Sequence, residues 1–263
     1  MLDDNRRKRY SRHLILPQVG EAGQEKLLAA SVLVVGAGGL GSPVIYYLAA
    51  AGVGRIGVVD SDVVDVSNLQ RQILHGTGDV GRLKVESARA RIAELNPDVE
   101  MVPIAGRAEP DNVMGLIEGY DVVVDACDNF PTRYLVNDAC VLQKKPFVYG
   151  SVYQFEGQAS VFSKEGGPCY RCMFPDPPDS DLVADESDPG ILGVVPGVIG
   201  NVQAAETIKL IVGTGESLSG RFLLFDALKM RFNELSIKRD PDCRVCGDSP
   251  GITEIDPGEV SYN

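Results

Sequence analysis

The stretch that decides the fold is SVLVVGAGGLGSPVIYYLAAAGVGRIGVVD, residues 31–60. An apolar run leads into Gly36-x-Gly38-x-x-Gly41, an alanine-rich segment follows, and a second apolar run ends at Asp60. This order predicts a strand, a glycine turn, a helix and a second, parallel strand, which together form a nucleotide-binding unit. Glycine permits positive φ and a close approach of the backbone to a phosphate, and the free N–H groups at a helix start attract an anion.

Asp60 ends the second predicted strand, where its carboxylate can accept hydrogen bonds from ribose hydroxyls. The pattern alone therefore indicates an adenine nucleotide and leaves the chemistry open. A glycine turn that only packs a helix on a sheet is the alternative, and the downstream Asp disfavours it.

The composition is that of an ordinary globular chain. Its 263 residues, 44% of them hydrophobic, suffice for one large α/β domain or two small ones. No apolar run approaches the roughly 18 residues of a membrane span, and the N-terminus lacks the apolar core of a signal peptide. We therefore expect a cytoplasmic protein with no membrane partner. A net charge of −12 argues against a nucleic-acid partner, so an ATP-binding chain of this charge must concentrate its cations locally.

Downstream of Asp60, apolar strands alternate with amphipathic helices as far as residue 150. We predict helices at 83–95, 111–118 and 132–143, and strands at 99–104, 121–125 and 146–149. This alternation predicts a Rossmann-like, doubly wound, mostly parallel sheet. Residues 61–83 lack a sustained period and predict a long loop with short helical turns, and loops of that length are commonly functional.

The pattern changes after residue 150. Segments 157–163, 221–226 and 230–238 resemble strands without helices of the earlier kind between them, so we predict an antiparallel extension of the sheet. The Asp- and Pro-rich stretch 173–190 predicts a mobile crossing loop, and 194–212 predicts an apolar helix.

We interpret residues 1–263 as one domain with a nucleotide-binding half (1–150), an antiparallel half (151–247) and an acidic, poorly ordered tail (248–263). The first 30 residues predict a short helix, an irregular turn and a second helix. They carry a basic cluster that ends at Arg12, for which a solvated helix face is the simplest interpretation.

Two pairs of cysteines, Cys169-x-x-Cys172 and Cys243-x-x-Cys246, are the strongest indication of a metal. Four thiolates in two such pairs match tetrahedral zinc, and a closed four-sulfur shell leaves no open position for a substrate. We therefore predict a structural zinc ion. Disulfides or unpaired thiols are the alternative, which a cytosolic compartment disfavours. The other two cysteines suit buried packing positions.

A second set of residues, Asn68, Arg71, Lys84 and Asp128, suits a bound triphosphate. Several cations, and a magnesium ion held by a carboxylate, are needed to neutralise the charge on a reacting phosphorus. Each of these residues alone is most often a solvated charge. Together, at the carboxyl edge of a nucleotide fold, they favour a magnesium triphosphate over hydride transfer.

Several motifs occur together along the chain: RYSRHLILP (9–17), GAGGLGSP (36–43), DSDVVDVSNLQRQILH (60–75), Gly81-x-x-Lys84, DACDN (125–129), the paired CxxC motifs and GVVPGVIGNVQAAETIKL (193–210). In this combination the chain resembles the MoeB/ThiF/HesA adenylyltransferase family, the bacterial relatives of ubiquitin-activating enzymes. The similarity covers about residues 9–247.

The resemblance implies that ATP adenylates the C-terminal glycine carboxylate of a small ubiquitin-like sulfur-carrier protein ending in Gly-Gly, with release of pyrophosphate. Arg12, Arg71, Lys84 and Asp128 would be catalytic, and Asp128 would hold magnesium. Arg12 would act as an arginine finger on the partner subunit's ATP in a symmetric homodimer, for which the apolar segment 191–212 gives weak support. The implied nucleotide-binding positions are Gly36, Gly38, Gly39, Gly41, Asp60, Asp62, Ser67, Asn68, Arg71, Lys84, Asp128 and Asn129.

The chain departs from the family pattern in the crossing loop. Many relatives have a cysteine four residues before the glycine that matches Gly190, whereas this chain has Glu186. We therefore expect adenylation alone, with sulfur delivered by a separate donor protein.

Three alternatives remain open. An NAD-dependent oxidoreductase would suit the glycine pattern and Asp60, but no proton donor is evident, since His13 and His75 lie outside the expected catalytic edge. A non-catalytic partner subunit would have no need for the phosphate-binding residues. A relative that adenylates a tRNA-linked carbonyl is disfavoured by the acidic surface.

Overall fold

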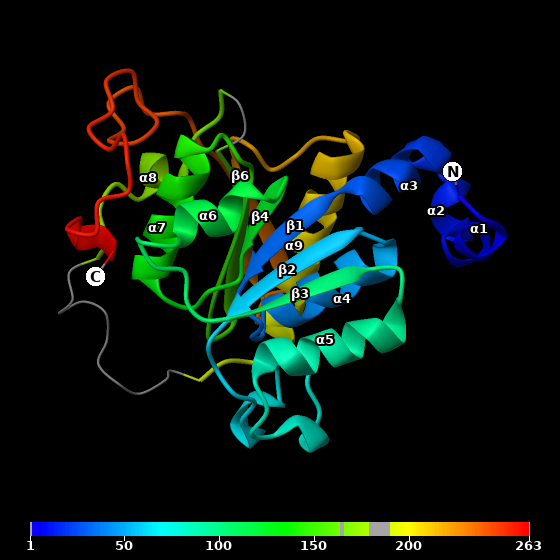
Figure 1. Ribbon diagram of the computed structural model, residues 1–263. Helices are drawn as coiled ribbons and strands as arrows, with labels where there is room; N and C mark the ends of the chain where they lie inside the picture. Colours follow the sequence, from blue (N-terminus) through cyan, green and yellow to red (C-terminus); the bar gives the residue numbers. More distant parts are fainter. Residues whose placement is uncertain (1, 164–165, 179–189, 263) are drawn as a thin grey trace.

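One eight-stranded sheet runs through the part of the chain that the computed structural model describes, residues 2–163, 166–178 and 190–262 (Figure 1). The strand order is β3-β2-β1-β4-β5-β6-β7-β8. The first five strands pair in parallel: β1 (Ser31–Val35), β2 (Arg55–Asp60), β3 (Glu100–Ala105), β4 (Val122–Asp125) and β5 (Phe147–Tyr153). The last three pair antiparallel: β6 (Glu156–Phe162), β7 (Arg221–Asp226) and β8 (Arg231–Ser236). The predicted mostly parallel sheet with an antiparallel extension is confirmed.

Helices cover both faces of the parallel part. One face packs against α4 (Gly41–Ala51), α5 (Lys84–Leu95) and α9 (Val194–Val212), and the other against α6 (Val113–Glu118), α7 (Phe130–Leu142) and α8 (Tyr170–Met173). Alternation along β1 explains this, because Val32 and Val34 belong to the first core and Leu33 and Val35 to the second. The sheet is therefore doubly wound.

The N-terminal residues form α1 (Asp4–Arg9), α2 (Ser11–Leu14) and α3 (Gly20–Ala29). The end of α3 lies at the amino end of β2, where the Gly54 amide donates to the Leu27 carbonyl at 3.0 Å. Residues 61–83 leave the opposite, carboxyl end of β2, away from these helices (Figure 1), and contain the short turns η1 (Val66–Asn68) and η2 (Thr77–Asp79). The predicted loop with short helical turns is confirmed.

The strand order reverses between β1 and β4, which both neighbour the centre of the sheet. Connections from the carboxyl ends of these two strands leave toward opposite faces, so a crevice opens between them where such sheets bind ligands. The glycine turn follows β1 and the segment Cys127–Asn129 follows β4. The candidate nucleotide site therefore lies at this reversal.

The predicted disorder of the tail is wrong. Ser261 and Tyr262 are 2% and 7% exposed, in the short turn η3 (Val260–Tyr262). The Tyr262 hydroxyl donates to Asp138 Oδ2 at 2.8 Å, and Arg171 Nη2 donates to Ser261 Oγ at 2.6 Å. The acidic, Gly- and Pro-containing composition suggested solvation, but these two residues satisfy a buried Arg171–Asp138 ion pair.

The homodimer expected from the apolar segment 191–212 stays a prediction, since Leu192 and Val194 are 45% and 60% exposed while other apolar residues of α9 pack within the chain. The buried residues Val195, Ile199, Ala204 and Val212 belong to the core under β4–β6 of the same chain. On α5, Val85, Ala88 and Ile92 are buried as the helical pattern predicts, whereas Leu95 is 37% exposed.

Most of the predicted crossing loop, including Glu186, lies outside the described residues. Within the described ranges, none of the helices combines the length and the apolar character that crossing a bilayer would require.

Candidate functional site

Two of the glycines in the turn after β1 are required by the folded chain itself. Gly36 has φ of +103°, and a Cβ atom there would lie 2.5 Å from the Ala126 carbonyl oxygen at the end of β4. A Cβ atom on Gly41 would overlap the Gly36 carbonyl oxygen. Packing alone therefore explains these two positions, and it brings the glycine turn against the segment that follows β4.

Packing does not explain Gly38. A Cβ atom there would meet no heavy atom closer than Gln72 Nε2, at 3.7 Å, which is ordinary contact. At Gly39 a Cβ atom would lie 3.2 Å from Pro196 and 3.5 Å from Arg71 Cγ. The open space at Gly38 is what a backbone that must approach a ligand requires, so the packing-only alternative accounts for only part of the pattern.

Asp60 holds the glycine turn in place. Its Oδ2 accepts from the Ala37 amide and its Oδ1 from the Asp62 amide, both at 2.8 Å. Each carboxylate oxygen has a further lone pair, so these bonds are compatible with the predicted acceptance from ribose hydroxyls.

His75 also contacts the glycine turn, and its placement away from the catalytic edge was wrong. The ring is 6% exposed, with Nε2 2.9 Å from the Ala37 carbonyl oxygen and Nδ1 2.8 Å from Ser87 Oγ. Because a carbonyl only accepts, we assign the proton to Nε2 and let Nδ1 accept from the Ser87 hydroxyl. Burial lowers the pKa of His75, which favours this neutral form.

His75 should make the protein less stable as the pH falls below about 6.5, the value for an unfolded histidine. Because the folded pKa is lowered, the unfolded chain takes up the proton first, and the free energy of unfolding decreases toward the folded pKa. Urea unfolding of His75→Gln should show a shallower loss between pH 6.5 and 5.5 than the unsubstituted chain, by up to about 1 kcal/mol. His13→Gln is the control, and equal slopes for the His75 variant and the unsubstituted chain would contradict this role.

Residues 65–71 form a compact polar turn. Asp65 accepts from the Ser67 amide at 2.8 Å and from Ser67 Oγ at 2.6 Å, and Asn68 Oδ1 accepts from the Asp65 amide at 3.1 Å. These bonds lower the pKa of Asp65, the Ser67 hydroxyl being the main cause. Arg71 Nη1 donates to the Ser67 carbonyl at 3.2 Å, and its stem lies beside Gly39.

Lys84 begins α5 and is 6% exposed. Its Nζ lies 2.8 Å from Asp62 Oδ2, and this hydrogen bond is the main reason that the pKa of Asp62 is lowered. Asp62 is more than half exposed, so a phosphate can compete for the same ammonium group. The structure thus brings Lys84, Asp62 and Arg71 to the carboxyl edge as predicted.

Asp128 and Asn129 are exposed beyond β4. Asn129 caps α7, since its Oδ1 accepts from the Thr132 amide at 3.0 Å, and its Nδ2 lies 3.4 Å from Asp128 Oδ1. Asp128 Oδ2 makes no hydrogen bond to a described residue, which leaves an oxygen of the kind that Mg²⁺ prefers. The donor set therefore fits a magnesium ion. Asp125, in contrast, is 1% exposed and paired with Arg133, so it is not a ligand-binding group.

Arg12 does not join this site within one chain. It is exposed on α2, near the amino ends of the strands, and makes no ion pair with another described residue. The cations before it are used locally, as in the Arg6–Asp98 pair at 3.1 Å and the Arg7–Glu21 pair.

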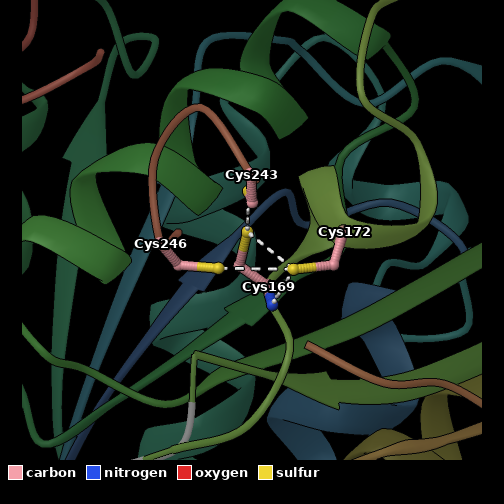
Figure 2. Close-up of side chains that lie close together, drawn as sticks. All are labelled: Cys169, Cys172, Cys243 and Cys246. Atoms are coloured by element: carbon pink, nitrogen blue, oxygen red, sulfur yellow. Dashed lines mark hydrogen bonds between the residues drawn. The ribbon is translucent and has the colours of Figure 1, made fainter. Parts of the chain in front are cut away.

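The four cysteines of the CxxC pairs converge from α8 and from a loop 70 residues downstream (Figure 2). The Sγ atoms lie within 4.8 Å of one another, with Cys169–Cys243 at 3.5 Å and Cys172–Cys246 at 3.3 Å. Sulfurs bound about 2.3 Å from a tetrahedral zinc are about 3.8 Å apart. This geometry fits zinc and excludes disulfides among these residues, since all six cysteines are free.

The downstream pair is held by its own turn. The Gly247 amide donates to the Cys243 carbonyl at 2.9 Å, and Arg239 Nη2 donates to the Cys246 carbonyl at 2.6 Å. A Cβ atom on Gly247 would crowd the Cys243 backbone. Outside this cluster, Cys127 and Cys140 are buried as expected.

Residues 10–245 match the sequence model of the ThiF family. The chain belongs to the ThiF family. Among curated relatives, it is 52% identical over 252 residues to the sulfur carrier protein adenylyltransferase of Thermus thermophilus, covering 94% of this chain and 93% of that protein. It is 51% identical to the SAMP-activating enzyme E1 of Haloferax volcanii, covering 99% and 95%.

A longer ThiF-family relative is the adenylyltransferase and sulfurtransferase MOCS3 of Sus scrofa, 54% identical over 94% of this chain. The chain spans about half of that protein, 54% of its length. Among solved structures, E. coli MccB with ATP superposes with a TM-score of 0.82 at 26% identity, over 91% of this chain and 74% of that one. The doubly wound fold is therefore shared with a protein whose structure has been solved with ATP.

Proposed function

We propose that this ThiF-family chain adenylates the C-terminal glycine carboxylate of a ubiquitin-like sulfur-carrier protein with ATP and releases pyrophosphate. The observation that carries the proposal is the meeting of three features at the strand-order reversal. These are a glycine turn open at Gly38, the cations Arg71 and Lys84, and the exposed carboxylate of Asp128.

The residues of the site have three proposed roles: nucleotide binding, phosphate binding and metal binding. Gly38, Gly39 and Asp60 hold the nucleotide, Arg71 and Lys84 neutralise the charge of its phosphates, and the side-chain amide of Asn68 donates a hydrogen bond to them. Asp128, with Asn129 beside it, would hold magnesium, which would supply positive charge to offset that of the phosphates. The carrier carboxylate attacks the α-phosphorus, the bond to the bridging oxygen breaks, and pyrophosphate leaves. Two anions must meet in this step, which explains why an acidic chain gathers cations here.

The proposed partner is supported by two relatives, one named for a sulfur carrier protein and the other for SAMP activation. We propose a carrier ending in Gly-Gly, because a tail of small residues can pass close to the nucleotide. We further propose a homodimer, a separate sulfur donor and a cytoplasmic location, where ATP and reduced thiols coexist. A zinc ion held by the four clustered cysteines would be structural.

Carrier-stimulated exchange of pyrophosphate into ATP is the direct test. Exchange that requires both a Gly-Gly carrier and magnesium supports the proposal. A thermal shift with NAD but none with ATP would favour an oxidoreductase instead. Absence of exchange with every carrier, together with ATP binding, would favour the non-catalytic subunit.

Mixing two inactive variants tests the proposed role of Arg12 across a dimer. Arg12→Ala and Asp128→Ala should each abolish exchange alone. After denaturation and refolding of an equal mixture, half of the dimers pair the two variants, and one of their two sites is intact, so about a quarter of the full activity should return. A mixture as inactive as its components would refute action in trans.

A further inference from the structure

Arg133 carries a charge that is buried beside the proposed active site. It lies in the first turn of α7 and is 5% exposed. Its Nε donates to Asp125 Oδ2 at 2.9 Å, and its Nη2 donates to the Cys127 carbonyl at 3.1 Å. The Cys127 amide donates back to Asp125 Oδ1 at 3.0 Å. One guanidinium group and one carboxylate therefore close a ring of hydrogen bonds around residues 125–127.

Stability alone does not explain this pair. Desolvation of two charges offsets much of their attraction, and well-packed apolar residues often serve a core equally well. An ion pair with directed hydrogen bonds instead fixes one backbone conformation. The Arg133 guanidinium group also lies over the aromatic ring of Tyr149, with its Cζ 5.1 Å from the ring centroid. This contact restricts the position of the guanidinium group further.

The fixed segment is the one that presents Asp128 to the glycine turn. The Ala126 amide donates to the Val35 carbonyl at 2.9 Å, and the Ala126 carbonyl faces Gly36 closely. Asp128 directly follows Cys127, whose carbonyl accepts the hydrogen bond from Arg133. The Cys127 peptide therefore fixes the backbone from which the Asp128 side chain projects.

We propose that Arg133 is a positioning residue that orients the Asp128 carboxylate toward the magnesium ion of the bound nucleotide. This proposal rests on the proposed function. Arg133 is not placed in contact with nucleotide or metal, because it is 5% exposed and its donors are bonded to Asp125 and Cys127.

A second buried ion pair, which joins α7 to α8, provides a matched control. Asp138 on α7 is paired with Arg171 at 2.7 Å, and both side chains are at most 1% exposed. That pair contacts Ser261 and Tyr262, and it forms no hydrogen bond with residues 125–129, all of which the structure describes. Replacing either arginine should destabilise the fold, but only the replacement of Arg133 should weaken binding of the metal ion at Asp128.

The test compares Arg133→Lys with Arg171→Lys. Both keep a positive charge, and both lose the planar, multi-donor geometry of guanidinium. For each, Mn²⁺ binding in the presence of a non-hydrolysable ATP analogue is measured by electron paramagnetic resonance, alongside the magnesium dependence of exchange. We expect Arg133→Lys to weaken metal affinity at least about tenfold, as loss of an outer-shell partner does. Analogue binding without metal should be unchanged, and Arg171→Lys should bind metal normally.

Equal metal affinities of the two variants would overturn the proposal. If Arg133→Lys does not fold, the double variant Arg133→Met with Asp125→Asn, which leaves no unpaired charge, takes its place under the same criterion. Failure of the proposed function would look different, because the unsubstituted chain would then show no exchange with any carrier, whatever the Mn²⁺ affinities of the two variants.

Discussion

Asp128→Asn should lower carrier-stimulated pyrophosphate exchange at least about a hundredfold. The carboxylate is exposed beside the glycine turn, with one oxygen free of hydrogen bonds to described residues. An amide oxygen is a weaker ligand for a hard cation, so the charge that builds on the phosphates would be poorly neutralised. The melting temperature should change little, because an exposed side chain with few contacts contributes little to stability.

Asp111→Asn is the control for this substitution. Asp111 is exposed on the connection before α6, and the same loss of charge there should leave exchange intact. If Asp128→Asn retained more than half of the exchange activity, magnesium would be held by other groups and the assigned site would be wrong.

Loss of the four-thiolate centre should be the most destabilising single change in the chain. Cys243→Ala removes one of four converging thiols, and Cys243 is 4% exposed. A structural zinc contributes its binding free energy to folding. We expect a cost of at least about 3 kcal/mol, or about 6–12 °C in melting temperature for a chain of this size.

Cys140→Ala separates the metal from ordinary packing. Cys140 is fully buried on α7 but outside the cluster, so its removal should cost about 1 kcal/mol and leave the metal content unchanged. Metal analysis should give one zinc per chain for the unsubstituted protein and for this control, and much less for Cys243→Ala. Less than half a zinc in the unsubstituted protein with reduced thiols would rule out the zinc centre.

Local patterns were enough for most elements. The bounds of α9 follow from an apolar run that begins after Gly193 and ends before Gly213, which takes positive φ as the helix cap. The spacing of the two cysteine pairs likewise predicted that the four thiols lie together, because such spacing is typical of a metal site. The bounds of α9 depend on residues close in sequence. The cysteine cluster depends on thiols, which have few roles in proteins other than metal binding, disulfides and packing.

Arg133 and His75 were missed for a shared reason. Both are polar residues whose partners come from other elements, Asp125 for Arg133 and Ala37 for His75. A signal did exist for Arg133, because it precedes the apolar residues Tyr134, Leu135 and Val136 in the predicted helix, and all four residues are buried. A charge at such a position must have a buried partner, although the sequence does not say which carboxylate provides it.

The amino-acid sequence by itself determined the doubly wound sheet, the glycine turn and the set of residues that we propose to bind phosphate and metal. Period, turn residues and ligand chemistry are local properties of the chain. Only the tertiary structure decided how the polar residues are used. In the fold, Asp125 forms a buried ion pair with Arg133, whereas Asp128 stays exposed. Ser261 and Tyr262 of the tail are buried against Arg171 and Asp138. The physical reason is that a polar group is used by whichever partner lies within hydrogen-bonding distance once water is excluded, and that partner is chosen by packing over the whole chain.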